Sequence, residues 1–453
     1  MSTVIQSAGS STAHVALLLY GSRGDIQPGV CLALELLHRG HRVSVVVPPN
    51  LVGFAKSVGI TEVFEIGHDT DSQWSSDTAM DAQRSSNPLT RARFALATVR
   101  AGIAAFDAGM RALFITDGAP LAGVDLVVAA PLCQARALAV TERLAIGLVV
   151  LRYAPMSHNG SFGPETGLLD AKPQSVVHRA WRAYDQLVWS VTGKSENRFR
   201  RSIGMNAATT PFPERLNVLQ IPQIQAFDPG IAPEVVQEWA GEPLAVKPVV
   251  GFFDLPGDTR RSLAEATSDD ADLAAWLSGG TPPIFVGFGS MPVGDPDAVM
   301  AVIRSAARTH GVRVVFSLGA PRGIDASDPD VFHVGAVDHS WLLPRCVAAV
   351  HHGGAGTTAA TLRAGIPSVI YAFTAEQPFW ARRIATLGLG AGRRFRELSE
   401  DHATADLAIA LGEPARQAAA EFALQMIDPR RSVGAAASIV ESAVPQRGSV
   451  LTR

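Results

Sequence analysis

The chain alternates short apolar runs with segments whose apolar positions recur every three or four residues. Buried parallel strands read as continuous apolar runs, and the helices that cover them show the second pattern. The apolar runs predict strands at residues 14–20, 41–47, 124–130, 146–151, 283–288, 312–317, 331–334, 347–350 and 368–371. The helical patterns fall mainly at residues 29–39, 90–114, 134–144, 175–190, 297–308, 357–364, 378–390, 400–411, 415–426 and 432–441. This alternation predicts an α/β protein built on parallel sheets.

The length of the chain requires more than one domain. A chain of 453 residues exceeds what one compact core accommodates, and a hydrophobic content of 47% is sufficient for two cores. Eight prolines lie between Pro211 and Pro256, and such proline-dense text with few periodic runs is typical of a connector. We therefore predict an amino-terminal domain of residues 1–235 and a carboxyl-terminal domain of residues 236–430. The remaining helical pattern, within 431–453, is expected to cross back onto the first domain.

Residues 347–377 gather most of the chemistry that the sequence offers. An apolar run ends in His351 and His352, a glycine-rich loop and a helix follow, and a second apolar run leads to Glu376 and Gln377. This order places the polar groups at the carboxyl ends of parallel strands, where ligands bind in such folds. Glycines allow close approach of the backbone, and the N–H groups that open a helix favour an anion by about 0.3–1 kcal/mol. The stretch predicts a cradle for a diphosphate.

A second strand–loop–helix pattern opens the chain, and its loop carries Asp25. The residues GSRGDIQP follow the first apolar run, and Pro28 is expected in the first turn of the next helix, where proline is tolerated. Asp25 is a candidate general base at the carboxyl end of a strand. The alternative is an ordinary loop carboxylate that caps the following helix, which is a common role of aspartate.

The motif HHGGAGTT, followed by EQPFWA, resembles the donor-binding signature of GT-B glycosyltransferases of family 1. That family includes sterol glucosyltransferases, plant secondary-metabolite glycosyltransferases, and bacterial antibiotic and glycolipid glycosyltransferases. GSRGDIQP is similar to the loop that holds the catalytic base in the antibiotic and sterol members, so the resemblance spans nearly the whole chain. It implies two Rossmann-like domains that face each other across a deep cleft.

The resemblance also implies a role for individual residues. Asp25 would remove the proton of the acceptor, a step in which a positioned base contributes about 10²–10⁴ in rate. Glu376 and Gln377 would hydrogen-bond the hydroxyl groups of the sugar. The donor nucleotide would be bound by residues of three further loops, namely Ser290, Val337 through its backbone, His352, Gly354, Gly356 and Thr357.

The acceptor is expected to contact insertions that follow the middle strands of the first domain. The helical pattern at 175–190 has an aromatic face with Trp181, Tyr184 and Trp189, which fits a flat or apolar acceptor, and Ser22 faces the same site from the first loop. The alternative is that these aromatic side chains pack on the domain. His158 lies in an irregular stretch, and a lone loop histidine usually has no catalytic role.

The nucleobase platform departs from the pattern of the plant members. Those members carry a tryptophan that stacks on the base and a glutamine three residues later, whereas Ala336 and His339 stand at these positions here. Trp341, two residues further on, is equally well explained as a packing residue. The sequence therefore leaves the nucleotide open between uridine and thymidine diphosphate.

Composition excludes several other classes of protein. A net charge of −3 offers no basic surface for nucleic acid, and no apolar run reaches the roughly 18 residues that predict a membrane-spanning helix. The first dozen residues lack the features of a signal peptide, and the three cysteines show neither metal-ligand spacing nor an even number for disulfides. We expect a cytoplasmic monomer or homodimer. Peripheral contact with a membrane is compatible with this composition.

Two Asp-Pro-Asp triplets, at 295–297 and 328–330, look like the Asp-x-Asp metal motif of GT-A glycosyltransferases. Their prolines favour turns in which aspartate caps the next element. If the glycine-rich loop and the helix N-termini neutralise the diphosphate, no metal is needed. We therefore expect no cofactor, and the nucleotide sugar is a co-substrate.

Together these features predict an inverting, metal-independent transfer of a sugar from a UDP- or dTDP-sugar to a hydroxyl of a hydrophobic acceptor. The expected sugar is a hexose such as glucose, and the expected acceptors are natural products, sterols or glycolipid aglycones. One alternative is a GT-B epimerase that acts on the nucleotide sugar itself and needs no acceptor pocket. Another is a non-catalytic module that binds a nucleotide sugar or a lipid, which slow hydrolysis of the donor would exclude.

Overall fold

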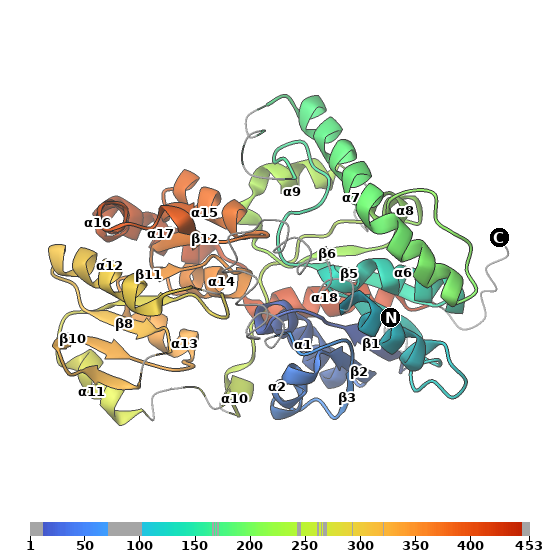
Figure 1. The fold of residues 1–453 in the computed structure, drawn as a ribbon, viewed down its shortest axis with the longest axis horizontal. Coiled ribbons are helices and arrows are strands. Elements are labelled where there is room, and N and C mark those ends of the chain that lie inside the picture. The colour runs from blue at the N-terminus through green and yellow to red at the C-terminus, as the bar shows by residue number, and fades with distance from the viewer. Residues whose placement is uncertain are drawn as a thin grey trace, which may run out of the picture.

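The computed structural model describes residues 12–70, 102–164, 167, 169, 172–241, 246–260, 262–263, 265, 270–291, 293–319 and 321–445. Two sheets of mostly parallel strands lie side by side in Figure 1, each covered by helices on both faces. The sequence also predicts a long polar loop at 67–90, which is described only as far as Thr70, and the helix predicted at 90–114 is described over 102–114. The rest of these two predictions lies outside the described residues.

The amino-terminal domain is built on a six-stranded parallel sheet with the order β3-β2-β1-β4-β5-β6. Its strands are β1 (His14–Leu18), β2 (Arg42–Val47), β3 (Glu62–Glu65), β4 (Leu126–Ala129), β5 (Gly147–Arg152) and β6 (Gln223–Gln225). Its principal helices are α1 (Arg23–His38), α2 (Val52–Ser57), α6 (Gln134–Leu144), α7 (Gln174–Ser202) and α8 (Phe212–Val218). The strand order reverses between β1 and β4, and a crevice for ligands forms at the carboxyl ends of strands at such a point.

The carboxyl-terminal domain has a seven-stranded sheet with the order β13-β12-β11-β7-β8-β10-β9. Its strands are β7 (Ile284–Gly287), β8 (Val314–Ser317), β9 (Gly323–Asp325), β10 (Asp328–His333), β11 (Ala348–His351), β12 (Ser368–Ala372) and β13 (Gly390–Arg394). Its helices are α11 (Ala271–Ser278), α12 (Pro296–Thr309), α13 (His339–Leu342), α14 (Ala355–Arg363), α15 (Gln377–Thr386), α16 (Glu400–Leu411) and α17 (Glu413–Gln425). Among the described strands of this sheet, only β9 runs antiparallel to its neighbour, and the apolar pattern did not reveal this short edge strand.

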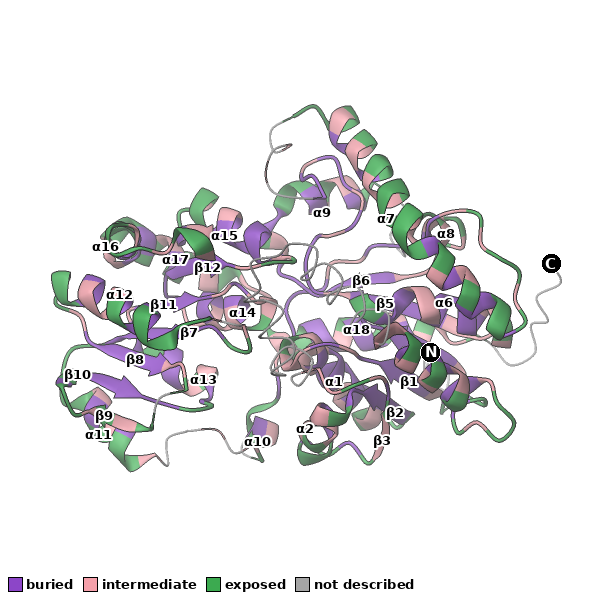
Figure 2. Cartoon of the chain, viewed as in Figure 1, coloured by how far each residue is buried: buried purple, intermediate pink, exposed green. Residues whose placement is uncertain are grey.

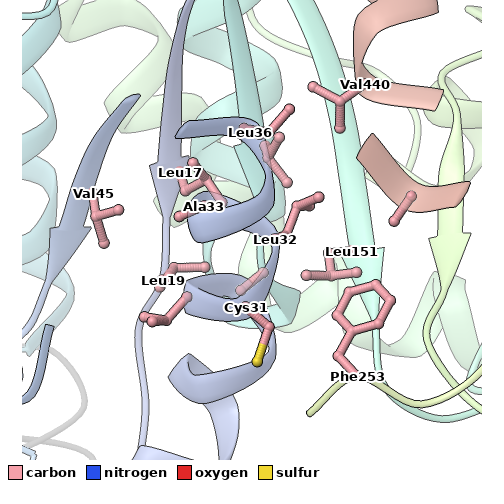
Figure 3. Packing of buried hydrophobic residues seen from close by; sticks show 14 of the residues in the cluster. Leu17, Leu19, Cys31, Leu32, Ala33, Leu36, Val45, Leu151, Phe253 and Val440 are labelled. Atoms are coloured by element: carbon pink, nitrogen blue, oxygen red, sulfur yellow. The ribbon is translucent and has the colours of Figure 1, made fainter. Parts of the chain in front are cut away.

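The core of the first domain is formed between its sheet and α1. Figure 3 shows Leu17 of β1 and Leu19, which directly follows that strand, facing Leu32 and Leu36 of α1, and all four are fully buried. Both faces of the strands are covered by helices, so the inner strands are apolar at nearly every position. Figure 2 shows the same distribution, with buried strands inside and exposed residues on the outer faces of the helices.

The proline-dense segment at 211–256, predicted as a connector, contains short regular elements. It holds α8, β6, a short 3-10 helix η3 (Pro229–Ile231) and α9 (Pro233–Ala240). Prolines occupy the first or second position of all three helices, where the missing N–H group has no partner to lose. Arg383 Nε of α15 donates to the Ile231 carbonyl at 2.7 Å, so this segment packs against the second domain.

The last helix, α18 (Pro429–Ala443), lies against α1 of the first domain (Figure 1). Its Val440 joins the first core, and its Glu441 accepts hydrogen bonds from Arg39 Nη1 at 2.8 Å and contacts His41 Nε2 at 3.1 Å. The chain therefore returns to its first domain after completing the second. This is the crossing that the sequence predicted for the residues after 430.

Two helices of the first domain are longer than predicted. Helix α1 begins at Arg23, six residues earlier than predicted, and includes Pro28. Pro28 removes one backbone donor from the helix, and the residue four positions before it, whose carbonyl loses that partner, is the exposed Gly24. Helix α7 continues twelve residues beyond the predicted end at Ser190, past Gly193. A Cβ at Gly193 would lie 2.9 Å from the Trp189 ring, so close packing explains this glycine.

In the part of the chain described here, no helix combines the length and apolarity that a bilayer crossing requires. The three cysteines, Cys31, Cys133 and Cys346, are free and buried.

Candidate active site

The reversal points of the two sheets face each other, because α1 of the first domain packs against α14 of the second (Figure 1). Asp25 lies in the first turn of α1, and Glu376 immediately precedes α15. The two carboxylates are close enough for the charge of Asp25 to raise the pKa of Glu376. The fold thus brings together two candidate site residues that are far apart in the sequence.

The carboxylate of Asp25 is held by the residue that caps its helix. Asp25 Oδ2 accepts hydrogen bonds from Ser22 N–H at 2.7 Å and from Ser22 Oγ at 2.8 Å. Gly21 has a φ of +129°, and a Cβ there would lie 2.4 Å from Asp25 Oδ2, so only glycine allows this approach. The capping role weighed for Asp25 is therefore real, and the carboxylate lies in a helical turn where a loop was predicted.

The environment of Asp25 also favours a base. Burial raises the pKa of its carboxyl, and the two hydrogen bonds from Ser22 oppose this effect only in part. The hydroxyl of Tyr153 donates to the Asp25 backbone carbonyl at 2.7 Å and so fixes the turn. Sequence reasoning missed Tyr153, although its position directly after β5, at the carboxyl end of a strand, was a usable signal.

His352 is enclosed by two glycines from different loops. A Cβ at Gly354 would lie 2.5 Å from His352 Nε2, and a Cβ at Gly289 would lie 3.2 Å from His352 Cε1. The loop after β7, with the exposed Ser290, therefore adjoins the loop after β11. Burial, assisted by the charge of His339, lowers the pKa of His352 to about 4, so the ring is neutral at physiological pH. Its Nδ1 is buried without a hydrogen-bond partner among the described residues.

The paired histidines have different surroundings. His351 is fully buried at the end of β11, and its Nδ1 accepts a hydrogen bond from Gly353 N–H at 3.1 Å. This bond shapes the turn, which needs glycine because Gly353 has a φ of +87°. His351 therefore supports the loop from behind, and His352 is the histidine that can meet a ligand.

Helix α14 begins at Ala355, two residues before the predicted start, with Gly354 as its N-cap. The first backbone bond of the helix runs from Thr358 N–H to the Gly354 carbonyl at 2.9 Å. The N–H groups of the three preceding residues, including Gly356 and Thr357, therefore have no partner inside the helix. With Ser290 close by, this helix start has the chemistry of an anion site.

The loop after β12 presents Glu376 under strain. Ala375 adopts a left-handed φ of +54°, which is unfavourable for alanine and typical of functional loops. Burial, together with the charge of Asp25, raises the pKa of Glu376 to about 7. Gln377 is buried, and its Oε1 accepts hydrogen bonds from Phe373 N–H at 2.9 Å and Thr374 N–H at 3.2 Å. Gln377 thus supports the loop that carries Glu376, and its bond to a sugar hydroxyl stays a prediction.

The predicted acceptor residues differ in exposure. Trp181 is only 4% exposed, and its Nε1 donates to the Phe162 carbonyl at 2.9 Å, which is the packing alternative weighed for this aromatic face. Tyr184 is half-buried and meets the Trp181 ring edge-on. His158 Nε2 bonds Asp185 Oδ2 of α7 at 2.5 Å. Acceptor contact by Tyr184 and Ser22 stays a prediction, while Trp181 supports the wall formed by the stretch after β5.

Around the predicted nucleobase position, most side chains already contact other parts of the protein. The Val337 side chain is buried in an apolar cluster, so only its backbone is available to a base, and the contact of that backbone with a base stays a prediction. His339 packs edge-on against Phe285, and burial lowers the pKa of its imidazole to about 4. Asp338 caps α13 by accepting Ser340 N–H at 2.8 Å.

A charged cluster beside this position had no signal in the sequence. Asp254 Oδ2 pairs with Arg363 Nη1 of α14 at 2.8 Å, and its Oδ1 pairs with Arg260. Arg260 also lies 3.4 Å from Asp338. Asp254 and Arg363 are far apart in the sequence, so no sequence pattern indicated the cluster. It places two guanidinium groups beside the predicted nucleobase position.

The first Asp-Pro-Asp triplet caps a helix, as predicted, whereas the second forms the first three residues of strand β10, so the turn predicted there is wrong. Asp295 accepts Ala298 N–H at 3.0 Å at the start of α12. Asp328 accepts Asp330 N–H at 3.2 Å and pairs with Arg308 at 2.8 Å. Within the described ranges, no group of three or more His, Cys, Asp or Glu residues has the arrangement of a metal site.

Sequence comparisons match this chain to glycosyltransferases. A family model described as "Erythromycin biosynthesis protein CIII-like, C-terminal domain" matches residues 305–440. An uncharacterized glycosyltransferase of Mycobacterium tuberculosis is 37% identical over 426 residues, which cover 94% of this chain and 97% of the relative. A sterol 3-beta-glucosyltransferase of Cryptococcus neoformans is 26% identical over 408 residues, covering 84% of this chain and 24% of that protein.

Solved structures share the fold at low sequence identity. The glycotransferase of kitacinnamycin superposes with a TM-score of 0.65 at 15% identity, covering 96% of this chain and 99% of that one. Arabidopsis thaliana UGT89C1 complexed with UDP has a TM-score of 0.64 at 14% identity, with 95% and 100% covered. The glycosyltransferase VinC in complex with dTDP has a TM-score of 0.57 at 16% identity, with 95% and 100% covered. With these two facing Rossmann-like domains and its full-length relatives, the chain belongs to the GT-B glycosyltransferases of family 1.

Proposed function

We propose that this glycosyltransferase moves a hexose from a UDP- or dTDP-sugar to a hydroxyl of a hydrophobic acceptor, with inversion and without a metal ion. The observation that carries the proposal is the packing of α1, which holds Asp25 in its first turn, against α14, whose first N–H groups form the anion site. The relatives named for sterol glucosylation and the solved structures complexed with UDP or dTDP support the substrate classes. We place the reaction in the cytoplasm, consistent with three free buried cysteines.

The donor diphosphate is expected at the start of α14. The free N–H groups of Gly356 and Thr357 and the hydroxyls of Thr357 and Ser290 offer donors to phosphate oxygens. Neutral His352 adds one N–H, because a ring with its pKa lowered to about 4 carries a single proton at neutral pH. Preorganised donors of this kind stabilise the charge that grows on a departing diphosphate, which is the work that a metal does elsewhere.

Asp25 is the proposed base. Its carboxylate takes the proton of the acceptor hydroxyl while the acceptor oxygen forms a bond to the anomeric carbon. The bond between that carbon and the phosphate oxygen breaks, and its electron pair leaves with the nucleoside diphosphate. The pKa of Asp25, raised by burial, makes this carboxylate a stronger base than an aspartate in water. A single displacement inverts the anomeric centre, so an α-linked donor gives a β-glycoside.

Glu376 is proposed to orient the sugar. Its carboxyl lies across from Asp25, and the strained loop that carries it is fixed by Gln377. Hydrogen bonds from sugar hydroxyls to Glu376 would place the anomeric carbon towards Asp25. Such positioning accounts for a large part of catalysis when two substrates react.

Asp25→Asn tests this assignment. Asparagine can still accept the hydrogen bonds from Ser22, so we expect a folded protein with unchanged donor affinity by calorimetric titration. Turnover, followed by mass spectrometry of the glycoside, should fall by about 10²–10⁴. Asp297→Asn in α12 is the matched control, and EDTA in the same assay tests the metal-independent step. Near-normal turnover of Asp25→Asn would refute the base assignment.

A panel of UDP- and dTDP-sugars against sterols, polyketides, phenols and glycolipid aglycones identifies the substrates. Incubation with donor alone separates the two alternative functions from transfer. An epimerase converts the nucleotide sugar without an acceptor, and a binding module leaves it intact. Glycoside formed only when an acceptor is present supports the proposed transferase.

A further inference from the structure

The outer face of α7 is unusually apolar for an exposed surface. Eight large hydrophobic side chains are exposed within the described part of the chain, and three of them lie in α7, more than in any other element. Leu187 is 65% exposed and Val191 is 76% exposed, with Val188 between them at 36%. Figure 2 shows this helix as a mostly exposed rod at the edge of the first domain.

A row of basic residues follows these apolar residues along the helix. Leu187, Val191, Lys194, Arg198 and Arg201 follow each other at alternating spacings of four and three, so they form one stripe along α7. The three basic residues of this stripe are exposed, and none forms an ion pair with another described residue.

The acids of α7 do not offset this charge on the outer face. Asp185 bonds His158 at 2.5 Å, and the buried Glu196 pairs with Arg215 of α8. Both acids are therefore turned to the domain and neutralised there. Along this stripe α7 therefore presents two exposed apolar residues followed by three exposed cations.

A hollow of about 440 Å³ opens beside the cationic half. Its lining includes Lys194, Arg198 and Arg201, together with the ring of Trp189. Asn197 forms its fixed side, donating to the Ala208 carbonyl at 3.0 Å and accepting from Ala208 N–H at 2.7 Å. Lysine and arginine around a concave site of this kind suit a phosphate group.

We propose that α7 docks on an anionic lipid surface. Leu187 and Val191 enter the interface between headgroups and acyl chains, and Lys194, Arg198 and Arg201 bind lipid phosphates in and beside the hollow. A helix with exposed apolar residues and clustered cations is the form that binds such surfaces. The inference does not depend on the proposed function.

Charge complementarity favours a membrane over a second copy of this chain. In a symmetric dimer the same patch meets itself, so each cation of one stripe requires an acid in the other. The stripe contains no acid, and two copies would bring like charges together. An anionic bilayer supplies both the negative charge and the apolar phase.

Co-sedimentation of the full chain with vesicles tests the proposal. We expect binding to phosphatidylcholine vesicles that contain phosphatidylglycerol, and binding at least about tenfold weaker to phosphatidylcholine alone. Each basic residue near an anionic surface contributes about fivefold in binding, so K194S/R198S should reduce binding by about 25-fold. L187S/V191S should reduce it by a similar factor. Matched controls are I409S/L424S and R416S/R430S, which change exposed residues of α16, α17 and α18.

Three results would each overturn the proposal. The first is equal binding to both kinds of vesicle, and the second is wild-type binding by the two α7 variants. The third is a dimer in light scattering that L187S/V191S converts to a monomer, which would assign the stripe to self-association. Thermal unfolding of the variants checks for a folding defect. None is expected, because all four changed side chains are exposed.

Discussion

Replacing Glu376 with Gln is expected to stabilise the protein at neutral and alkaline pH. Burial and the nearby charge of Asp25 raise the pKa of Glu376 from 4.5 to about 7. Each pKa unit corresponds to about 1.36 kcal/mol, so ionised Glu376 destabilises the folded state by at most about 3.4 kcal/mol. Glu376 keeps some contact with solvent, which screens the charge and lowers the expected effect to about 1–2 kcal/mol. Glutamine has a similar shape and no charge.

This gain in stability depends on pH because Glu376 binds its proton more tightly in the folded protein than in the unfolded chain. Below pH 4.5 Glu376 is protonated in both states, so the variant and the wild type should have similar stability. Between pH 4.5 and about 7 the unfolded chain releases the proton and the folded protein retains it. The wild type therefore loses stability relative to Glu376→Gln as pH rises through this window. Above it the difference is constant.

Urea unfolding of both proteins across this pH range measures the effect. His351 and His352 are buried with lowered pKa values, so their contribution is lost as pH falls, in the opposite direction. They are unchanged in the variant, and taking the difference at each pH removes them. Glu413→Gln, which changes an exposed residue of α17, is the control. A difference between wild type and Glu376→Gln that stays flat with pH would refute the reasoning, because only a titrating group produces the slope.

Substitutions at three further residues test separate parts of the molecule. Gly354→Ala puts a Cβ 2.5 Å from His352 Nε2, so the imidazole ring must move. The affinity for UDP or dTDP, measured by calorimetry, should fall about 10–100-fold. Unchanged affinity would contradict this close packing. Glu441→Gln weakens the contacts to Arg39 and His41 and should lower the free energy of unfolding by about 1–2 kcal/mol, whereas equal stability would mean that these contacts do not help to hold α18. Because His352 has a pKa of about 4, its ring is neutral at pH 7, and His352→Gln should retain more nucleotide affinity than His352→Ala; a wild-type affinity that rises from pH 8 to pH 5.5 would point to a charged ring.

The donor side of the site was predictable because its signals are local. Glycines beside a strand end and a helix start lie next to each other in the chain, and their geometry depends on few neighbours. His352 and Glu376 therefore follow strands β11 and β12, as predicted. Errors arose where a local rule had an exception. Pro28 was expected in the first turn of its helix, but α1 begins at Arg23 and includes it.

The acceptor side was less predictable because an amphipathic pattern does not say which partner covers a face. Trp181 is buried against Phe162, while Leu187 and Val191 on the same helix face solvent. Their hydrophobicity is similar, and only the path of the stretch after β5 distinguishes them. Tyr153 was missed for a related reason, since its bond to Asp25 joins residues 128 positions apart.

By itself the sequence determined the two parallel sheets, the glycine loops and the family, because periodicity, turn chemistry and motif spacing are properties of neighbouring residues. Only the tertiary structure decided that Asp25 lies near enough to Glu376 to raise its pKa, and which protonation states the two carboxyls favour. Those states follow from desolvation and from charges contributed by distant segments. Desolvation depends on what packs around a group in space, and that packing exists only once the two domains have folded against each other.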